Sequence, residues 1–110
     1  MKRYIGSRTE DGCQVTVMED ERPPRPLALR LEIRNHSATG FEWGYGGSGP
    51  AQLALALAMD VLGDADRAQR VYQTLKFKLV GRLPNHAWEL SEDQLSSAIK
   101  SIERGQNRER

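Results

Sequence analysis

The sequence has a single cysteine, almost no excess charge and no long apolar run. Cys13 alone cannot form an internal disulfide or a multi-cysteine zinc site, so we expect a reducing compartment. A formal net charge of +1 over 110 residues gives no overall attraction to nucleic acid or to an acidic membrane. The longest apolar run, 53–59 with its flanks, is far shorter than the roughly 20 residues that span a bilayer. Residues 1–4 lead into polar sequence and not into a signal peptide. The chain therefore predicts a soluble, cytoplasmic protein.

Three segments predict β-strands. Residues 3–8 and 13–18 flank Asp11-Gly12, a pair that favours a hairpin turn because both positions tolerate positive φ. Residues 27–34 alternate Leu or Ile with other residues, which is the pattern of a strand with one buried face. The charged, proline-rich residues 19–26 predict a surface loop, because proline is excluded from a sheet interior.

Three helices are predicted to follow. The first begins at Pro50, with Ser48 or Gly49 as its N-cap, and ends before Gly63. Because this segment is apolar all round, we expect it to be the central core helix.

The second predicted helix starts at Asp64 or Ala65 and closes at Gly81 and Pro84. Residues 85–90 predict a connector, and Ser91 is expected to cap the last helix. The fold class is therefore α+β: a three-stranded antiparallel sheet with three helices packed on one face. We expect a single domain over residues 1–104 and a disordered tail over 105–110.

The segment 40–49 is a glycine-rich loop that leads into the core helix. Exposed amides of Gly46, Gly47, Ser48 and Gly49 could hold a phosphate or a nucleotide at the helix start. The segment lacks the Gly-Lys-Ser/Thr ending of a P-loop and the spacing of a dinucleotide-binding motif. A structural role for these glycines in a tightly folded loop is therefore favoured over anion binding.

Three aromatic residues, Phe41, Trp43 and Tyr45, alternate in the same loop. They either pack on the sheet or form a platform for a ligand or partner, and packing is favoured. Tyr45 is expected to be the most exposed of the three.

Few residues suggest catalysis or metal binding. His36, His86 and Glu42 could share a metal or act as acid and base, but they fall at no known ligand spacing. Histidine side chains that hold loop backbone together are favoured instead. Cys13 is predicted to be a small buried apolar side chain. We predict no cofactor, no metal and no catalytic residue, and a non-enzymatic protein is favoured over an enzyme.

Arg67, Arg70 and Lys78, with Arg82 near their edge, form a basic stripe along the second predicted helix. A solvated helix face explains such a stripe better than phosphate contacts do. Nucleic acid is therefore the least favoured partner.

Residues 34–37 (R-N-H-S) and 39–54 (T-G-F-E-W-G-Y-G-G-S-G-P-A-Q-L-A) resemble the signature of an uncharacterised family of small bacterial and phage-borne proteins. The resemblance extends over nearly the whole chain, through Tyr72, Arg82-Leu83-Pro84 and Trp88. It implies no catalytic residue. It does imply genes on phages and other mobile elements, whose small proteins often bind host defence or regulatory machinery.

We therefore expect a small non-enzymatic binding protein that blocks or sequesters a protein of the bacterial host. The expected contact residues are His36, Trp43, Tyr45, Arg67, Arg70 and Lys78. The alternative is a phosphate or nucleotide binder, or an enzyme, that uses Gly46, Gly47, Ser48 and Gly49.

Overall fold

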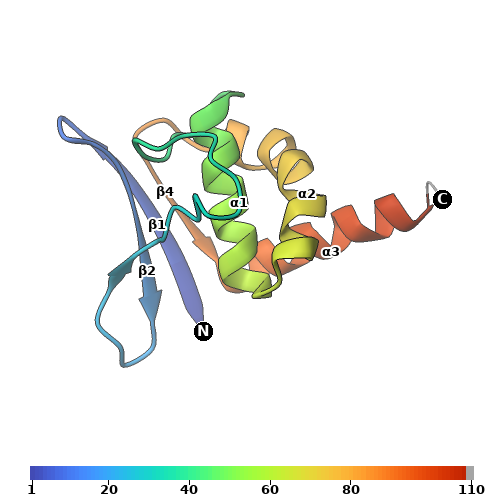
Figure 1. The fold of residues 1–110 in the computed structure, drawn as a ribbon. Coiled ribbons are helices and arrows are strands. Elements are labelled where there is room, and N and C mark those ends of the chain that lie inside the picture. The colour runs from blue at the N-terminus through green and yellow to red at the C-terminus, as the bar shows by residue number, and fades with distance from the viewer. Residues whose placement is uncertain (109–110) are drawn as a thin grey trace.

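The computed structural model describes residues 1–108, in which helices cover one face of an antiparallel sheet (Figure 1). In chain order the elements are β1 (Lys2–Thr9), β2 (Gly12–Glu19), β3 (Arg25–Pro26), α1 (Ser48–Leu62), α2 (Ala65–Lys78), the 3₁₀ helix η1 (Val80–Arg82), β4 (Ala87–Ser91) and α3 (Glu92–Arg108). The predicted α+β class is confirmed, but the sheet has four strands, in the order β3-β2-β1-β4, where three are predicted. No helix in the described part of the chain is long and apolar enough to cross a bilayer.

β1 and β2 form the predicted hairpin. The register pairs Tyr4 with Val17 and Gly6 with Val15, and all four residues are buried. Gly12 takes φ of 110°, a conformation that glycine reaches without strain, and this ends the turn between the two strands.

The predicted connector over residues 85–90 is wrong, because most of it belongs to the strand β4. It pairs antiparallel with β1 and places Trp88 opposite Gly6. A Cβ atom at residue 6 would overlap the Trp88 indole, so only glycine leaves room for that ring. Trp88 and Leu90 are buried while Ala87 and Glu89 are exposed, which is the alternation of a half-buried strand. The pattern is only five residues long and leads straight into α3, so it is easily taken for a connector.

Residues 27–34 do not form the predicted strand. β3 is confined to Arg25–Pro26, at the sheet edge, where proline is tolerated. Leu27 N–H donates to Val15 O at 3.0 Å, and the chain then leaves the sheet and turns at Arg30, with φ of 62°. The Leu and Ile side chains of this segment are nevertheless buried or half-buried. Their alternation therefore indicates burial and not strand pairing.

α1 is the core helix that the sequence predicts. Every residue from Gly49 to Ala58 is buried, because α1 lies between the sheet and α2 (Figure 1). The helix starts earlier than predicted: its N-cap is Gly47, without a side-chain capping bond, and Pro50 is its third residue and not its first. Gly63 ends the helix as predicted, with φ of 64° and its N–H donating to Met59 O.

α2 starts at Ala65, one of the two predicted start positions, but it ends earlier than predicted. The Asp64 carboxylate accepts from Asp66 N–H and Arg67 N–H, which satisfies two free donors of the first turn. The helix stops at Lys78, and η1 occupies residues that are predicted to continue it.

α3 begins with the predicted Ser91 cap. Ser91 Oγ accepts from Gln94 N–H while Gln94 Oε1 accepts from Ser91 N–H, which is a reciprocal capping box. The helix continues to Arg108, so residues 105–108 of the predicted tail are helical. Residues 109–110 of that tail lie outside the described residues.

A cluster of charged side chains joins α1 to the sheet. The Asp60 carboxylate, 12% exposed, accepts from Tyr4 Oη at 2.6 Å, Lys2 Nζ at 3.2 Å and Arg25 Nη2 at 3.0 Å. Burial acts to raise the pKa of Asp60, but these hydrogen bonds outweigh it and hold the pKa below its usual value. Burial and the neighbouring carboxylate raise the pKa of Tyr4, so its hydroxyl remains a donor.

Acid is expected to weaken the fold through Asp60. Because the pKa of Asp60 is lower in the folded state than in the unfolded chain, where it is about 3.9, the carboxylate stabilises the fold above that pH. The contribution is lost as the pH falls through the folded-state pKa. Asp60→Asn should lower the free energy of unfolding at neutral pH and flatten its fall below about pH 4. Urea denaturation across this pH range measures both effects. Glu89→Gln, in an exposed pair with Arg3, is the control and should keep the wild-type profile.

Gly6→Ala is expected to destabilise the protein by about 1–3 kcal/mol, because the new methyl group overlaps the buried Trp88 ring. Gly105→Ala is the matched control, since a Cβ there meets nothing within 4 Å. It should be neutral or slightly stabilising, as glycine is unfavourable in a helix. Chemical denaturation measures both changes. Equal stability of the two variants would mean that Trp88 moves aside without cost.

Candidate functional site

Trp43 anchors the glycine-rich loop in the core. Its side chain is 1% exposed, and its indole N–H donates to Asn85 O at 2.9 Å. The ring meets Trp88 edge to face, with centroids 5.3 Å apart, and the Arg8 guanidinium lies 5.2 Å from the Trp43 ring centroid. Phe41 is buried as well. Trp43 therefore serves packing and does not lie on the expected contact surface.

An ion pair between Arg8 of β1 and Glu42 joins the glycine-rich loop to the sheet near the start of α1. Two hydrogen-bonded contacts, of 2.8 and 3.0 Å, join the Arg8 guanidinium to the Glu42 carboxylate. The hydrogen bond from Arg8 lowers the pKa of Glu42 by more than burial raises it. A Cβ at Gly49 would overlap the Glu42 side chain, so glycine allows this close approach. The Glu42 side chain thus lies against the N-terminal end of α1, the end of a helix that attracts anions. Anion binding by residues 46–49 stays a prediction.

Tyr45 and Phe77 are two exposed aromatic residues that lie beside Gly46 and Gly47. Tyr45 is 51% exposed, as predicted for the outermost aromatic of the loop, and Phe77 is 64% exposed. A Cβ at Gly46 would lie 4.0 Å from Phe77 Cε1, and one at Gly47 would lie 3.0 Å from Tyr45 Cε2. Both rings therefore lie against the same short stretch of backbone. We refer to Tyr45, Gly46, Gly47 and Phe77 as the aromatic surface.

Phe77 is the member of this surface that is not among the residues predicted from the sequence. It lies outside the buried stripe of α2, which consists of Ala68, Val71, Tyr72 and Leu75. An aromatic residue on the polar side of a helix, between Lys76 and Lys78, is the signal that could have identified it.

Cations border the aromatic surface. Lys76 Nζ lies 4.4 Å from the Phe77 ring centroid. A Cβ at Gly81 would lie 3.2 Å from both Lys76 O and Tyr45 O, so the backbone of η1 passes beside the aromatic surface one residue before the exposed Arg82. Lys76 and Arg82 form no ion pair with any side chain that the structure describes. Between Arg67 and Trp88 the sequence contains no acidic residue at all.

The remaining expected contact residues do not join this surface. His36 Nε2 lies 2.7 Å from Tyr72 Oη, and Arg67 binds both oxygens of Glu103 at 2.9 and 3.0 Å. Arg70 and Lys78 are exposed on α2, but Lys78 borders a hollow shared with α3. The structure therefore brings only Tyr45, of the expected residues, to the aromatic surface.

The candidate catalytic and metal-binding side chains are not assembled. Within residues 1–108, no three His, Cys, Asp or Glu side chains are grouped so that they could hold a metal ion, and His36, His86 and Glu42 are no exception. Burial raises the pKa of the half-buried Cys13 thiol, and a hydrogen bond to Glu42 acts in the same direction. The thiol is therefore protonated at neutral pH and is a poor nucleophile.

Gln52 of α1 holds the loop that replaces the predicted strand. Its side chain is 0% exposed. Its Oε1 accepts from His36 N–H at 2.7 Å and from Ser37 N–H at 3.1 Å. Its Nε2 donates to Leu29 O and to Arg34 O. One buried amide thus uses its full hydrogen-bonding capacity on residues 29–37.

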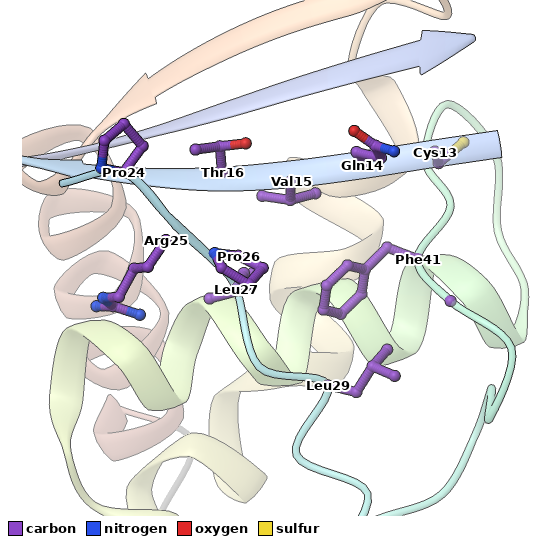
Figure 2. Close-up of a pocket in the computed structure, with 11 residues that line it drawn as sticks. Cys13, Gln14, Val15, Thr16, Pro24, Arg25, Pro26, Leu27, Leu29 and Phe41 are labelled. Atoms are coloured by element: carbon purple, nitrogen blue, oxygen red, sulfur yellow. The ribbon is translucent and has the colours of Figure 1, made fainter. Parts of the chain in front are cut away.

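A cavity of about 580 Å³ lies between β2 and this loop (Figure 2). Val15, Leu27, Leu29 and Phe41 form its apolar walls, and β2 borders it from Cys13 to Thr16. The volume is within the usual range of ligand sites in proteins.

Gln52→Leu is expected to release the loop. The change keeps a similar volume but leaves two carbonyls and two amides without their partner, at about 1–3 kcal/mol for each group that stays shielded from water. We expect a large loss of stability and faster trypsin cleavage after Arg30 and Arg34, measured by mass spectrometry under native conditions. Gln14→Leu, at an exposed position of β2 on the face turned away from the cavity, is the control. Wild-type cleavage rates in Gln52→Leu would show that the loop is held by other contacts.

Comparison with known proteins gives a family and no activity. A family model matches residues 4–101, from β1 into α3. No curated protein and no solved structure matches the chain. The predicted membership in an uncharacterised family is confirmed: the chain belongs to DUF6166, a family of unknown function.

Proposed function

We propose that the chain is a binding module that recognises a protein partner through the aromatic surface. The observation that carries this proposal is the exposure of two large aromatic side chains beside adjacent glycines, Phe77 beside Gly46 and Tyr45 beside Gly47. Single exposed apolar residues are common on proteins, but neighbouring large ones mark interaction sites. Tyrosine also contributes strongly to protein interfaces, since it offers a wide apolar face and a hydroxyl.

The backbone that carries the aromatic surface is held in place before any partner arrives. Gly44 N–H donates to Val80 O at 3.1 Å, which joins the loop to η1. Gly44 takes φ of 84°, and the anchored Trp43 immediately precedes it. A surface ordered in advance loses less conformational entropy on binding, so this rigidity supports a role in recognition.

The charges around the aromatic surface favour a partner with carboxylates at its contact face. Lys76 and Arg82 are free to pair with such groups, and complementary charge speeds association. The basic stretch is bounded in the chain by Asp66 on one side and Glu89 on the other. A protein that binds a nucleic-acid strand usually contacts many phosphates with a long row of basic side chains. The few cations here are better suited to a small acidic area on a protein.

The origin of the partner is a separate matter. A phage or mobile-element setting and a target in the defence or regulatory machinery of a bacterial host stay predictions from the family resemblance. The family match attaches no activity to the chain.

The test is an affinity capture from nuclease-treated bacterial lysate with the wild-type chain and a Tyr45→Ala/Phe77→Ala double variant. We expect the wild type to retain a protein in stoichiometric amount and the double variant to lose it, because interface aromatics often contribute about 2 kcal/mol each. The purified partner should then bind the double variant at least about thirtyfold more weakly than the wild type.

Two further variants sharpen this test. Lys100→Ala, exposed on α3, is the control for any surface substitution. Arg70→Ala removes an expected contact residue that lies seven positions before Phe77 on α2 and borders a hollow shared with Glu103 of α3. Loss of the partner in Arg70→Ala with retention in the double variant would move the interface along α2. Failure of the wild type to retain any protein would contradict the proposed function.

A further inference from the structure

The outer edge of β2 is open where β3 stops. β3 pairs only with Thr16 and Val17, and Leu27 N–H adds one bond to Val15 O. Backbone groups of alternate residues in a strand point to the same edge, so those of Cys13 and Val15 point outward together. Cys13 N–H, Cys13 C=O and Val15 N–H therefore have no strand partner among residues 1–108.

The cavity beside this edge occupies the place of a longer β3. Continuing the β2–β3 register beyond Leu27 would set Leu29 opposite Cys13. Gln52 instead binds Leu29 O and Arg34 O, which draws this part of the chain onto α1. In Figure 2, Val15 points toward Leu29 and Phe41 across the gap, while Gln14 and Thr16 point away from it. An open strand edge and an apolar pocket thus lie together.

We propose that this groove binds an extended peptide segment of a partner by strand addition, antiparallel to β2 and in line with β3. Leu27 already lies opposite Val15, so the segment begins beyond it and is held by main-chain hydrogen bonds to Cys13 N–H and Cys13 C=O. One apolar side chain enters the cavity between Val15, Leu29 and Phe41. Because strand side chains alternate, the residues on either side of it lie on the face of Gln14 and Thr16 and are polar. The recognised pattern is polar–apolar–polar.

The chemistry of the groove selects this occupant. Free N–H and C=O groups at strand spacing are satisfied best by another extended backbone, and a compact apolar ligand would leave them unbonded. The site is separate from the aromatic surface, which is built from the glycine-rich loop and α2. It therefore does not depend on the proposed function.

The test is a screen of a displayed library of linear eight-residue peptides against the full chain, followed by calorimetry with the selected peptides. We expect peptides with the polar–apolar–polar pattern. N-methylation of a peptide amide that faces β2 should weaken binding about tenfold or more, whereas methylation of the next amide should have little effect. Slower hydrogen exchange at the Cys13 amide should locate the peptide.

Variants of the chain complete the test. Cys13→Pro removes the outward N–H without removing a hairpin hydrogen bond and should weaken binding about tenfold. Cys13→Val keeps that N–H and is the matched control. Tyr45→Ala/Phe77→Ala should bind these peptides as the wild type does, which separates this site from the aromatic surface.

Three results would overturn the proposal. One is a screen that selects no peptide, and another is binding that neither N-methylation nor Cys13→Pro affects. The third is a concentration-dependent dimer that Cys13→Pro abolishes, because the occupant of the edge would then be a second copy of this chain.

Discussion

The buried amide of Gln52 is the interaction on which the other features of this structure depend. α1 is otherwise an apolar helix, and Gln52 is the one polar side chain within its fully buried stretch. Its hydrogen bonds fasten the backbone of residues 29–37 to α1 instead of to the sheet. That attachment leaves the outer edge of β2 unpaired and creates the adjoining cavity. It also sets the point from which the chain enters the glycine-rich loop.

Local signals predict much of the fold. Asp11-Gly12, the apolar run of α1, and the caps Gly63, Asp64 and Ser91 act within a few residues, so the sequence shows them directly. β4 and residues 27–34 depend on partners far away in the chain. Alternation predicts which side chains are buried, but the backbone partner of Leu29 is a side chain on α1 and that of β4 is β1. Such choices are set by tertiary contacts that no local pattern contains.

The candidate site shows the same division. Trp43 and Tyr45 are both aromatic and two residues apart, yet Trp43 is buried because Asn85 and Trp88 cover it, and Tyr45 has no such cover. Arg67 and Arg70 look equivalent on a helix surface until Glu103 of α3 pairs with the first of them. The exposed Phe77 could be recognised from helical periodicity alone. Its position beside Gly46, next to the glycine that Tyr45 covers, could not be predicted, since α2 and the glycine-rich loop come together only in the folded chain.

The pairing of β4 with β1 also imposes an order on assembly during synthesis. β1 is complete within the first residues of the chain, but the strand that covers its second edge ends at Ser91. A growing chain can close the β1–β2 hairpin and gather α1 and α2 while Gly6 still lacks the indole that fills the space beside it. Until the C-terminal part leaves the ribosome, the nascent sheet has exposed edges on both sides, and such edges pair readily with other chains. The interval between the synthesis of β1 and that of β4 is therefore when this small protein is most open to wrong association.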